Sequence, residues 1–151
     1  MIEIVRCTTA APDFVELVRG LDADLRDRYG AIQDSYAPHN KVERIETAVV
    51  ALEHGRAVGC GCFKTHPHGE ATVELKRMYV VPVARGRRIG AQIVGALEQW
   101  ARELGFGAAV LETGDQQHEA IALYTRCGYT RTPNFPPYDS LPASVCMQKH
   151  L

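Results

Sequence analysis

The sequence has no long apolar run and almost no net charge. No segment approaches the roughly 20 apolar residues that a membrane-spanning helix needs. The first six residues, Met-Ile-Glu-Ile-Val-Arg, alternate like a strand and do not resemble a signal sequence. The formal net charge is -1, so the overall field offers no attraction for nucleic acid or for an anionic membrane. We therefore expect a cytoplasmic protein that binds neither of these partners.

The sequence also lacks recognisable metal-binding and disulfide motifs. Its five cysteines form no C-x-x-C pair, and no cysteine and histidine stand at the spacing of a zinc site. Cys60 and Cys62 fall on one face of a predicted strand, where small buried residues are expected. His66 and His68 flank Pro67, which predicts an exposed hairpin turn. We therefore expect reduced thiols and no metal centre.

The pattern of apolar residues indicates a mixed α/β fold. With 151 residues, the chain is expected to form a single domain spanning residues 1–151. The patterns predict, in order, strand 2–7, helix 12–29, strands 47–54, 57–65 and 71–81, a helix that opens after residue 85 and ends at Gly105, strand 107–113, helix 116–127, and strands 129–132 and 143–149. A meander followed by strand, helix and strand predicts a mixed sheet with helices on both faces.

Residues 85–95, Arg-Gly-Arg-Arg-Ile-Gly-Ala-Gln-Ile-Val-Gly, form a predicted phosphate site. They follow a strand that Pro82 ends, and they open an amphipathic helix. Small residues at the first turn of a helix expose backbone N–H groups, and the helix dipole adds positive charge there. No Gly-Lys-Ser/Thr follows, and the glycine spacing is not G-x-G-x-x-G, so the segment is neither a P-loop nor a dinucleotide fingerprint.

Two segments resemble conserved blocks of the GNAT acyltransferase superfamily. The first is Arg85-x-x-Arg88-x-Gly90, which is close to the superfamily pattern Gln/Arg-x-x-Gly-x-Gly/Ala. The second runs from a strand end at 111–114, Leu-Glu-Thr-Gly, into Ala-x-x-Leu-Tyr-x-x-x-Gly-Tyr at 120–129. The resemblance is close over residues 47–131. Arg88 stands where the superfamily usually has glycine, and we expect no positive φ there because a residue entering a helix needs none.

The resemblance implies a GNAT-like central sheet of about six or seven strands and acetyl-CoA as cosubstrate. In the superfamily, the strands corresponding to 71–81 and 107–113 splay apart, and the pantetheine arm lies between them. Arg126 could equally be a solvated cation at a helix end, and Thr113 could equally be a helix cap. The implied cofactor contacts are Met78, Val80, Arg85, Gly86, Arg87, Arg88, Ile89, Gly90, Ala91, Thr113, Tyr124 and Arg126.

The resemblance also implies roles in catalysis. Glu74 lies eleven residues before Arg85, where several superfamily members place a catalytic carboxylate, and it is the candidate base. The alternative is a structural carboxylate paired with Lys76 or Arg77, two adjacent charges that indicate a bulge or a pocket in this strand. The amide of Met78 matches the group that polarises the thioester, and Tyr124 matches the superfamily acid that protonates the leaving sulfur.

The acceptor is predicted to be a primary amine of a small molecule. Residues 132–139 form a proline-stiffened loop whose Phe135 and Tyr138 are expected to wall the acceptor site. Tyr36 and Glu112 are the other expected acceptor contacts. Two alternatives stay open, namely acetylation of a protein or peptide and a non-catalytic coenzyme A sensor. The sequence is also compatible with a homodimer.

Overall fold

The computed structural model describes residues 1–30 and 44–151 of the chain. Tyr36, one of the predicted acceptor contacts, lies outside the described residues. The helices are α1 (Pro12–Tyr29), α3 (Ile89–Glu103) and α4 (His118–Arg126), and the strands are β1 (Ile2–Cys7), β2 (Ala48–Glu53), β3 (Arg56–Thr65), β4 (Thr72–Val80), β5 (Ala108–Gly114), β6 (Thr130–Thr132) and β7 (Ser144–His150). Short 3-10 turns, η2 (Pro82–Ala84) and η3 (Tyr138–Ser140), complete these elements.

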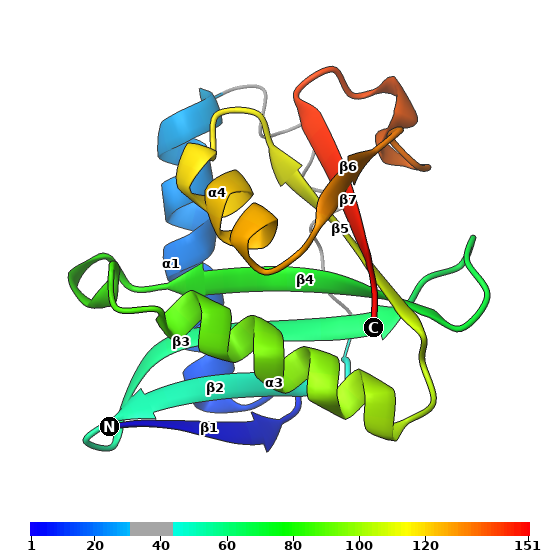
Figure 1. Cartoon of the computed structure of the whole chain (residues 1–151). Helices are drawn as coiled ribbons and strands as arrows, with labels where there is room; N and C mark the ends of the chain where they lie inside the picture. Colours follow the sequence, from blue (N-terminus) through cyan, green and yellow to red (C-terminus); the bar gives the residue numbers. More distant parts are fainter. Residues whose placement is uncertain (31–43) are drawn as a thin grey trace.

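The seven strands form one sheet in the order β1-β2-β3-β4-β5-β7-β6 (Figure 1). The β4 and β5 strands are parallel, because α3 carries the chain back across the sheet between them, and the other neighbouring strands are antiparallel. This arrangement confirms the predicted mixed sheet. The predicted strand and helix positions agree with the observed elements to within a few residues at each end.

Helices cover both faces of the sheet. In Figure 1, α3 and α4 lie in front of the sheet and α1 lies behind it. Ile93 and Leu97 of α3 pack on the front face in the larger core, whereas Phe14 and Leu17 of α1 pack on the back face in a second core. Each helix buries one apolar stripe, as its 3.6-residue periodicity predicts. The two faces of the sheet are therefore covered by different helices, and side chains on opposite faces pack against different helices.

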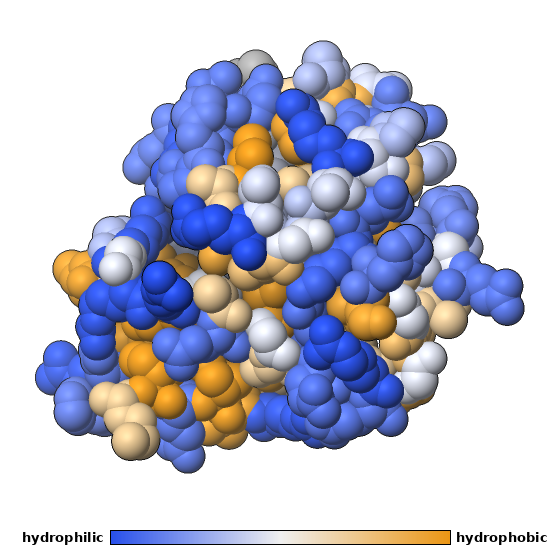
Figure 2. Space-filling model, viewed as in Figure 1, coloured by the Kyte–Doolittle hydropathy of each residue, from blue (hydrophilic) through white to orange (hydrophobic). Residues whose placement is uncertain are grey.

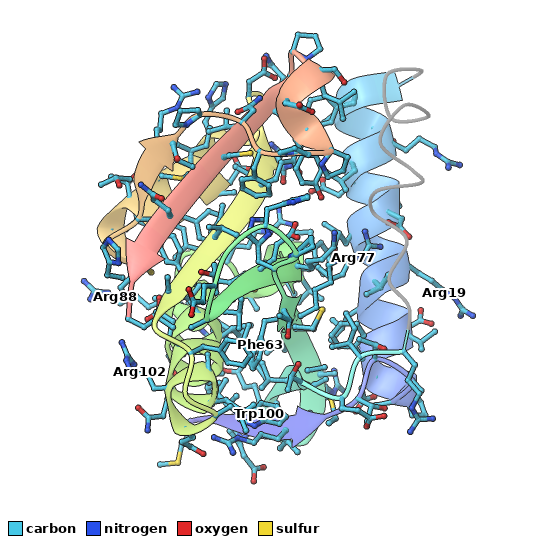
Figure 3. All side chains as sticks on the ribbon, turned by 90° about the vertical axis from the view of Figure 1, so that its right-hand side faces the viewer. Arg19, Phe63, Arg77, Arg88, Trp100 and Arg102 are labelled. Atoms are coloured by element: carbon cyan, nitrogen blue, oxygen red, sulfur yellow. The ribbon has the colours of Figure 1, made fainter. Side chains whose placement is uncertain are left out.

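A bulge interrupts β4 at Arg77. The antiparallel register of β3 and β4 shifts between Cys60 and Cys62, and Arg77 has a φ of +58°. The extra residue turns the adjacent Lys76 and Arg77 away from strict alternation, which confirms the irregularity that the two charges indicate. Figure 3 shows Arg77 between the sheet and α1, while Arg88 lies on the far side of the molecule.

The surface of the α3 side is mostly hydrophilic. Figure 2 shows hydrophobic side chains gathered toward the lower left of this view, over the end of the molecule where β1 and β2 lie in Figure 1. Within residues 1–30 and 44–151, no helix is both long enough and apolar enough to cross a membrane. The same residues contain no group of three or more histidine, cysteine, aspartate or glutamate side chains suited to a metal ion.

Candidate active site

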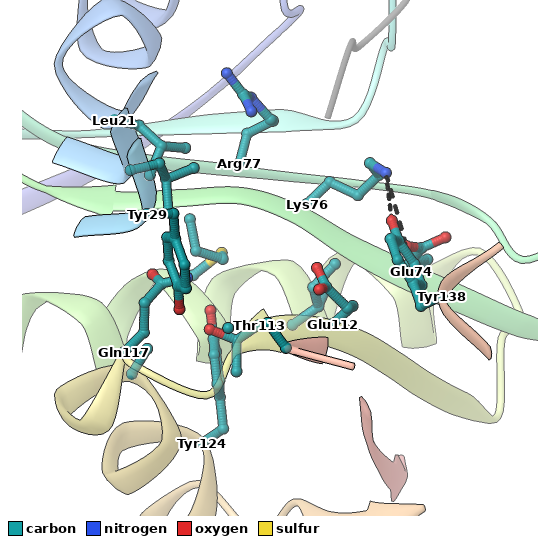
Figure 4. Close-up of a pocket in the computed structure, with 16 residues that line it drawn as sticks. Leu21, Tyr29, Glu74, Lys76, Arg77, Glu112, Thr113, Gln117, Tyr124 and Tyr138 are labelled. Atoms are coloured by element: carbon teal, nitrogen blue, oxygen red, sulfur yellow. Dashed lines mark hydrogen bonds and ion pairs between the residues drawn. The ribbon is translucent and has the colours of Figure 1, made fainter. Parts of the chain in front are cut away.

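A pocket opens where β4 and β5 separate. Residues Thr72 to Leu75 of β4 pair with Ala108 to Leu111 of β5, and the pairing of the two strands ends after Leu75 and Leu111. β5 itself continues alongside β7 to Gly114. Beyond Leu75, β4 therefore has no strand on its β5 side, and its backbone groups need another partner. The pocket at this split (Figure 4) is lined by Leu21, Leu25, Tyr29, Glu74, Leu75, Lys76, Arg77, Met78, Glu112, Thr113, Gly114, Gln117, Ala120, Tyr124, Tyr138 and Ala143.

The pocket passes through the sheet from one helical layer to the other. Leu75 and Leu111 belong to the core beneath α3. Because side chains alternate along a strand, Glu74 and Glu112 point to the opposite side, toward α1. Tyr124 enters the pocket from α4, on the α3 side. Glu74 and Glu112 thus reach the split between β4 and β5 from the α1 side, and Tyr124 reaches it from the α3 side.

The C-terminal end of α1 is held against the end of β5. The Tyr29 hydroxyl accepts a hydrogen bond from the backbone N–H of Gln116 at 3.0 Å. Gly114 is required for this approach, since a Cβ there would lie 1.8 Å from the Tyr29 hydroxyl oxygen. Arg28 also donates to the Gln116 carbonyl at 3.1 Å. These contacts place Leu21, Leu25 and Tyr29 as one wall of the pocket, which no local sequence motif indicates.

Glu74 is buried, with 5% of its surface exposed, and it is surrounded by polar side chains. The Tyr138 hydroxyl donates to Glu74 Oε2 at 3.3 Å, and Lys76 Nζ lies 3.7 Å from the same oxygen. Lys76 Nζ also donates to the Tyr138 hydroxyl at 3.3 Å, and Figure 4 draws the contacts of Lys76 with Glu74 and with Tyr138. Burial lowers the pKa of Lys76, and the nearby Glu74 partly offsets this effect. The structural pairing with Lys76 is thus real, while Arg77 instead pairs with Asp22 of α1 at 2.5 Å.

Glu112 is the second carboxylate of the pocket. It accepts a hydrogen bond from the Ser144 hydroxyl at 2.7 Å. Burial raises the pKa of Glu112 to about 7, and the hydrogen bond from Ser144 and the charge of Lys76 offset only part of the increase. A carboxyl group with such a pKa exists in both protonation states near neutral pH, so it can bind an ammonium group or accept its proton.

We predict that Glu112→Gln removes a pH-dependent loss of stability. The pKa of Glu112 in the folded protein is above its usual value of 4.5, so the proton stabilises the folded state. This contribution is complete below pH 4.5 and is lost as the pH rises to about 7. At pH 8 the variant should therefore exceed the wild type in free energy of unfolding by up to about 3 kcal/mol. Urea unfolding at pH 5 and pH 8 measures the difference.

The matched control for this experiment is Glu3→Gln, which changes an exposed carboxylate on the edge strand β1. It should leave the pH dependence of unfolding unchanged. If the Glu112 variant and the wild type lost stability in parallel between pH 5 and pH 8, the protonation of Glu112 would not contribute to stability.

Tyr124 is a buried tyrosine that lines the pocket from α4. Its side chain is 5% exposed, and its ring packs edge-on against Tyr129 with 6.0 Å between the ring centroids. Burial raises the pKa of Tyr124, so the hydroxyl keeps its proton throughout the neutral range. Thr113 is also buried and lines the pocket from β5. The capping alternative for Thr113 is excluded, because α4 starts at His118 after the uncapped residue Gln117.

The predicted phosphate cradle is an uncapped helix start. Helix α3 begins at Ile89, and no side chain caps its first turn. The N–H groups of Ile89, Gly90 and Ala91 therefore remain available for an anion. Gly90 has an additional role, because a Cβ there would lie 2.9 Å from Leu123 of α4. This glycine allows α3 and α4 to approach each other beside the pocket.

The expectation of an ordinary φ at Arg88 is wrong. Arg88 precedes α3 in the left-handed region, with φ +63° and ψ 19°. Gly86 has a φ of +80°, so the chain makes two left-handed turns before it enters the helix. The preference for glycine at this position in the superfamily pattern therefore has a local conformational cause. The arginine itself does not indicate this turn, although the glycine that the superfamily pattern usually has at this position is consistent with it.

We predict that Arg88→Gly stabilises the protein by about 1 kcal/mol, because glycine adopts the left-handed conformation without the steric cost of a Cβ. Coenzyme A affinity should stay the same or improve slightly, since the Arg88 side chain is exposed. Urea unfolding and coenzyme A titration at two salt concentrations measure these effects. Arg88→Ala is the control, because it removes the charge and keeps the Cβ. An equal, salt-dependent loss of affinity in both variants would instead assign the guanidinium to a phosphate.

The other predicted cofactor arginines occupy contacts within the chain. Arg85 donates to the Val80 carbonyl at 2.8 Å and lies 3.8 Å from Asp24 of α1. Arg87 forms an ion pair with Glu53 of β2. Arg126, the last residue of α4, is exposed. None of these residues lines the pocket. A phosphate that they contact, as predicted, would therefore lie on the surface outside the pocket.

The proline-rich loop at residues 132–139 reaches the pocket through Tyr138. Tyr138 is buried and lines the pocket, as the prediction requires, and it also contacts Glu74 directly. Phe135 lies one layer farther out and is not among the lining residues. Its ring packs edge-on against Tyr138 at 5.6 Å and against His66 at 4.8 Å, measured between centroids. Phe135 thus supports the wall that Tyr138 forms.

Two expectations about isolated side chains have different outcomes. The predicted exposure of His66 is wrong, because Phe135 covers it and only 6% of its surface is exposed. Cys60 and Cys62 are buried free thiols, as expected. They donate to the carbonyls of Arg77 and Lys76 at 3.4 Å each, within the β4 bulge. Burial raises the pKa of both thiols, so neither is a nucleophile.

Comparison with known proteins identifies relatives along the full chain. The model of the acetyltransferase (GNAT) family matches residues 15–129. An IAA acetyltransferase of Azospirillum brasilense is 34% identical over 151 residues, which cover 99% of this chain and 98% of the relative. An aminoalkylphosphonate N-acetyltransferase of Salmonella typhimurium is 30% identical over 108 residues, 69% of each chain.

Solved structures share the same architecture. A Klebsiella pneumoniae crystal structure assigned as an acyl-CoA N-acyltransferase has a TM-score of 0.81 and 35% identity, and it covers 100% of this chain and 98% of the other. The PaiA N-acetyltransferase of Thermoplasma acidophilum, solved with coenzyme A, has a TM-score of 0.70 at 15% identity and covers 100% and 99% of the two chains. The second likeness concerns the fold alone. With the family model, the full-length relative and the split sheet in agreement, the chain belongs to the acetyltransferase (GNAT) family.

Proposed function

We propose that the protein transfers an acetyl group from acetyl-CoA to a primary amine of a small molecule, with Glu74 as base and Tyr124 as the group that assists the leaving sulfur. The observation that carries this proposal is the pocket at the β4–β5 split, where Glu74, Glu112 and Tyr124 converge. Family membership supports the reaction type, and the uncapped start of α3 beside this split suits the phosphates of the cosubstrate.

When bound, acetyl-CoA would supply an activated thioester. The first turn of α3, at Ile89, Gly90 and Ala91, would hold its phosphates, and the open edge of β4 at Met78 and Val80 would hold the pantetheine arm. The pairing of β4 with β5 ends at Leu75, and in the proposal the Met78 amide polarises the thioester carbonyl. An oxyanion donor of this kind contributes about 10² to 10³ in rate.

The acceptor side must convert an ammonium group into a free amine. A lysine-like amine has a pKa near 10.4, so only about one molecule in 2,500 is neutral at pH 7. Glu74 and Glu112 both face the α1 side of the pocket and attract the ammonium group. Glu74 removes the proton, and Glu112 holds the acceptor in place. Comparison of Glu74→Gln with Glu112→Gln tests this division of roles.

The walls of the pocket favour a small acceptor over a peptide. Leu21, Leu25 and Tyr29 bound it on the α1 side, and Tyr138 and Ala143 bound it on the side of β7. The name of the Salmonella relative refers to an aminoalkylphosphonate, a small molecule that carries an amine. A coenzyme A sensor would need only the cradle and the open edge of β4. The two buried carboxylates and Tyr124 in one pocket support catalysis instead.

The experiment that tests the proposal is an acetyl-CoA-dependent screen of small primary amines, read by release of the free thiol and by mass spectrometry of the product. Acetyl-CoA should also stabilise the folded protein by roughly 2.7 kcal/mol at about a hundred times its Kd, whereas NAD and ATP should do much less. Stabilisation without any acetylated amine would favour the sensor. An acetylated peptide with no small-molecule product would favour the peptide acceptor, and a protein that acetyl-CoA left unstabilised would contradict the cofactor assignment.

A further inference from the structure

His66 is a buried polar residue next to Glu74 whose role the acetyl transfer leaves unexplained. It follows β3 directly and is 6% exposed. Its Nδ1 atom is buried, has no hydrogen-bond partner, and lies 3.9 Å from Glu74 Oε1. Buried nitrogen atoms in proteins are usually hydrogen-bonded, so an unpartnered one this close to a carboxylate calls for a reason.

The proposed reaction requires a proton to leave the buried site in every turnover. An ammonium acceptor has three N–H protons, and the amide product keeps one of them. A second proton is accounted for by the S–H group of the thiol, which forms when the carbon–sulfur bond breaks. The remaining proton is received by Glu74 and must reach the solvent before the next cycle. Glu74 is only 5% exposed, and its pocket is filled by the acceptor or its product at that stage.

The two oxygens of Glu74 face different groups. Oε2 receives the Tyr138 hydroxyl at 3.3 Å and lies 3.7 Å from Lys76. Oε1 is the oxygen closer to His66. His68 packs edge-on against His66, with 5.7 Å between the ring centroids, and His68 is exposed. His66 thus lies next to both Glu74, which lines the pocket, and the exposed His68.

We propose that His66 relays the proton from Glu74 to the solvent beside His68. The inference rests on the proposed function, because it assigns the same proton that Glu74 removes. In the step, the O–H bond of protonated Glu74 breaks and an N–H bond forms at His66 Nδ1. The imidazolium then loses the proton on Nε2 to water beside His68. Rotation of the ring about its Cβ–Cγ bond next brings the protonated Nδ1 to water, where Nδ1 loses its proton and Nε2 gains one, and the ring turns back in its original tautomer. No oxidant or further reactant is needed.

The charges around His66 suit this role. Burial lowers the pKa of His66 most strongly, His68 and Lys64 lower it further, and Glu74 partly opposes these effects. The resting imidazole is therefore neutral at neutral pH and has a lone pair available at one nitrogen. Phe135 contributes no charge, but its ring, 4.8 Å from that of His66, keeps water from the imidazole face.

The test compares His66→Asn with His54→Asn, a matched control in the exposed β2–β3 turn, where a φ of +50° suits asparagine. We expect His66→Asn to lower kcat about tenfold, with both KM values unchanged, and added imidazole to restore part of the rate. His54→Asn should behave like the wild type. An unchanged kcat, or a loss that neither imidazole nor buffer concentration affects, would show that His66 serves packing alone and would overturn the relay.

A double variant provides a second criterion. If His66 acts only on the proton that Glu74 receives, Glu74→Gln with His66→Asn should be no slower than Glu74→Gln alone. A further tenfold loss in the double variant would overturn the relay. His66→Gln takes the place of His66→Asn if the latter does not fold. A wild type that acetylates no amine would contradict the proposed function itself, whereas an active wild type, an impaired Glu74→Gln and a normal His66→Asn would contradict the relay alone.

Discussion

Tyr124→Phe is expected to lower kcat about 100-fold while the affinity for acetyl-CoA changes little. The substitution keeps the buried ring and its contact with Tyr129 and removes only the hydroxyl. The loss of one donor to a developing negative charge costs roughly 10² to 10³ in rate. Steady-state kinetics with a saturating acceptor measure kcat, and a titration with coenzyme A measures the affinity.

The role of Tyr124 is better described as hydrogen-bond donation than as full proton transfer. Burial raises the pKa of Tyr124 above its usual value of 10, whereas a thiol has a pKa near 8.5. Complete transfer to the thiolate is therefore unfavourable, but a hydrogen bond to the sulfur as its charge develops is favourable. The direction of the pKa shift thus supports a donor that remains protonated through the neutral range.

Tyr129→Phe is the matched control for Tyr124→Phe. Tyr129 packs against Tyr124 and is also buried, with 1% of its surface exposed, but it does not line the pocket. This control should leave kcat unchanged, since it removes a hydroxyl that is remote from the reacting atoms. If Tyr124→Phe also kept the full kcat, then Tyr124 would be a packing residue and a water molecule would protonate the sulfur.

Glu74→Gln is expected to lower kcat/KM by about 100-fold or more at pH 7, with a larger loss at lower pH. Below the pKa of the acceptor, almost all of the amine is protonated and needs a base. At pH 9, about one lysine-like amine in 25 is already neutral, so the defect should shrink. The introduced amide is expected to keep the hydrogen bond from Tyr138, because its oxygen can still accept it. The pH profile of kcat/KM for the variant and the wild type measures this effect.

Glu112→Gln in the same assay separates binding from proton removal. If Glu112 holds the ammonium group, its loss should raise the acceptor KM and leave the shape of the pH profile unchanged. If Glu112→Gln abolished the acidic limb and Glu74→Gln did not, Glu112 would be the base. A melting curve for each variant shows whether loss of the contact between Glu74 and Lys76 has also destabilised the fold.

Patterns in the sequence were sufficient to predict most of the architecture. Strand and helix periodicities are local properties, because each depends on residues two to four positions apart. The sequence therefore indicated the start of α3, the helix α4 that carries Tyr124, and the central strands. The parallel crossover from β4 to β5 followed from the order of these elements. The adjacent charges Lys76 and Arg77 also indicated the bulge, since strict alternation would have buried one of them against the α3 core.

The positions of several side chains were decided only by tertiary structure. His66 stands beside proline and glycine, which indicated a turn, but the distant Phe135 buries it. Arg85 pairs with Asp24 and Arg87 with Glu53, so ion pairs across the fold hold side chains that the motif assigned to a ligand. The left-handed conformation of Arg88 is not indicated by the arginine itself, which rarely adopts it, and only the glycine usual at this position in the superfamily pattern is consistent with it.

The sequence by itself determined the family, the order of the elements and two of the residues proposed for catalysis, because these depend on local patterns and short motifs. Only the tertiary structure decided what surrounds those two residues. The wall formed by Tyr29, the contact of Tyr138 with Glu74 and the proximity of His66 join segments far apart in the chain. The physical reason is that such contacts depend on how helices and loops pack on the sheet, and many sequences with the same periodicity can pack differently.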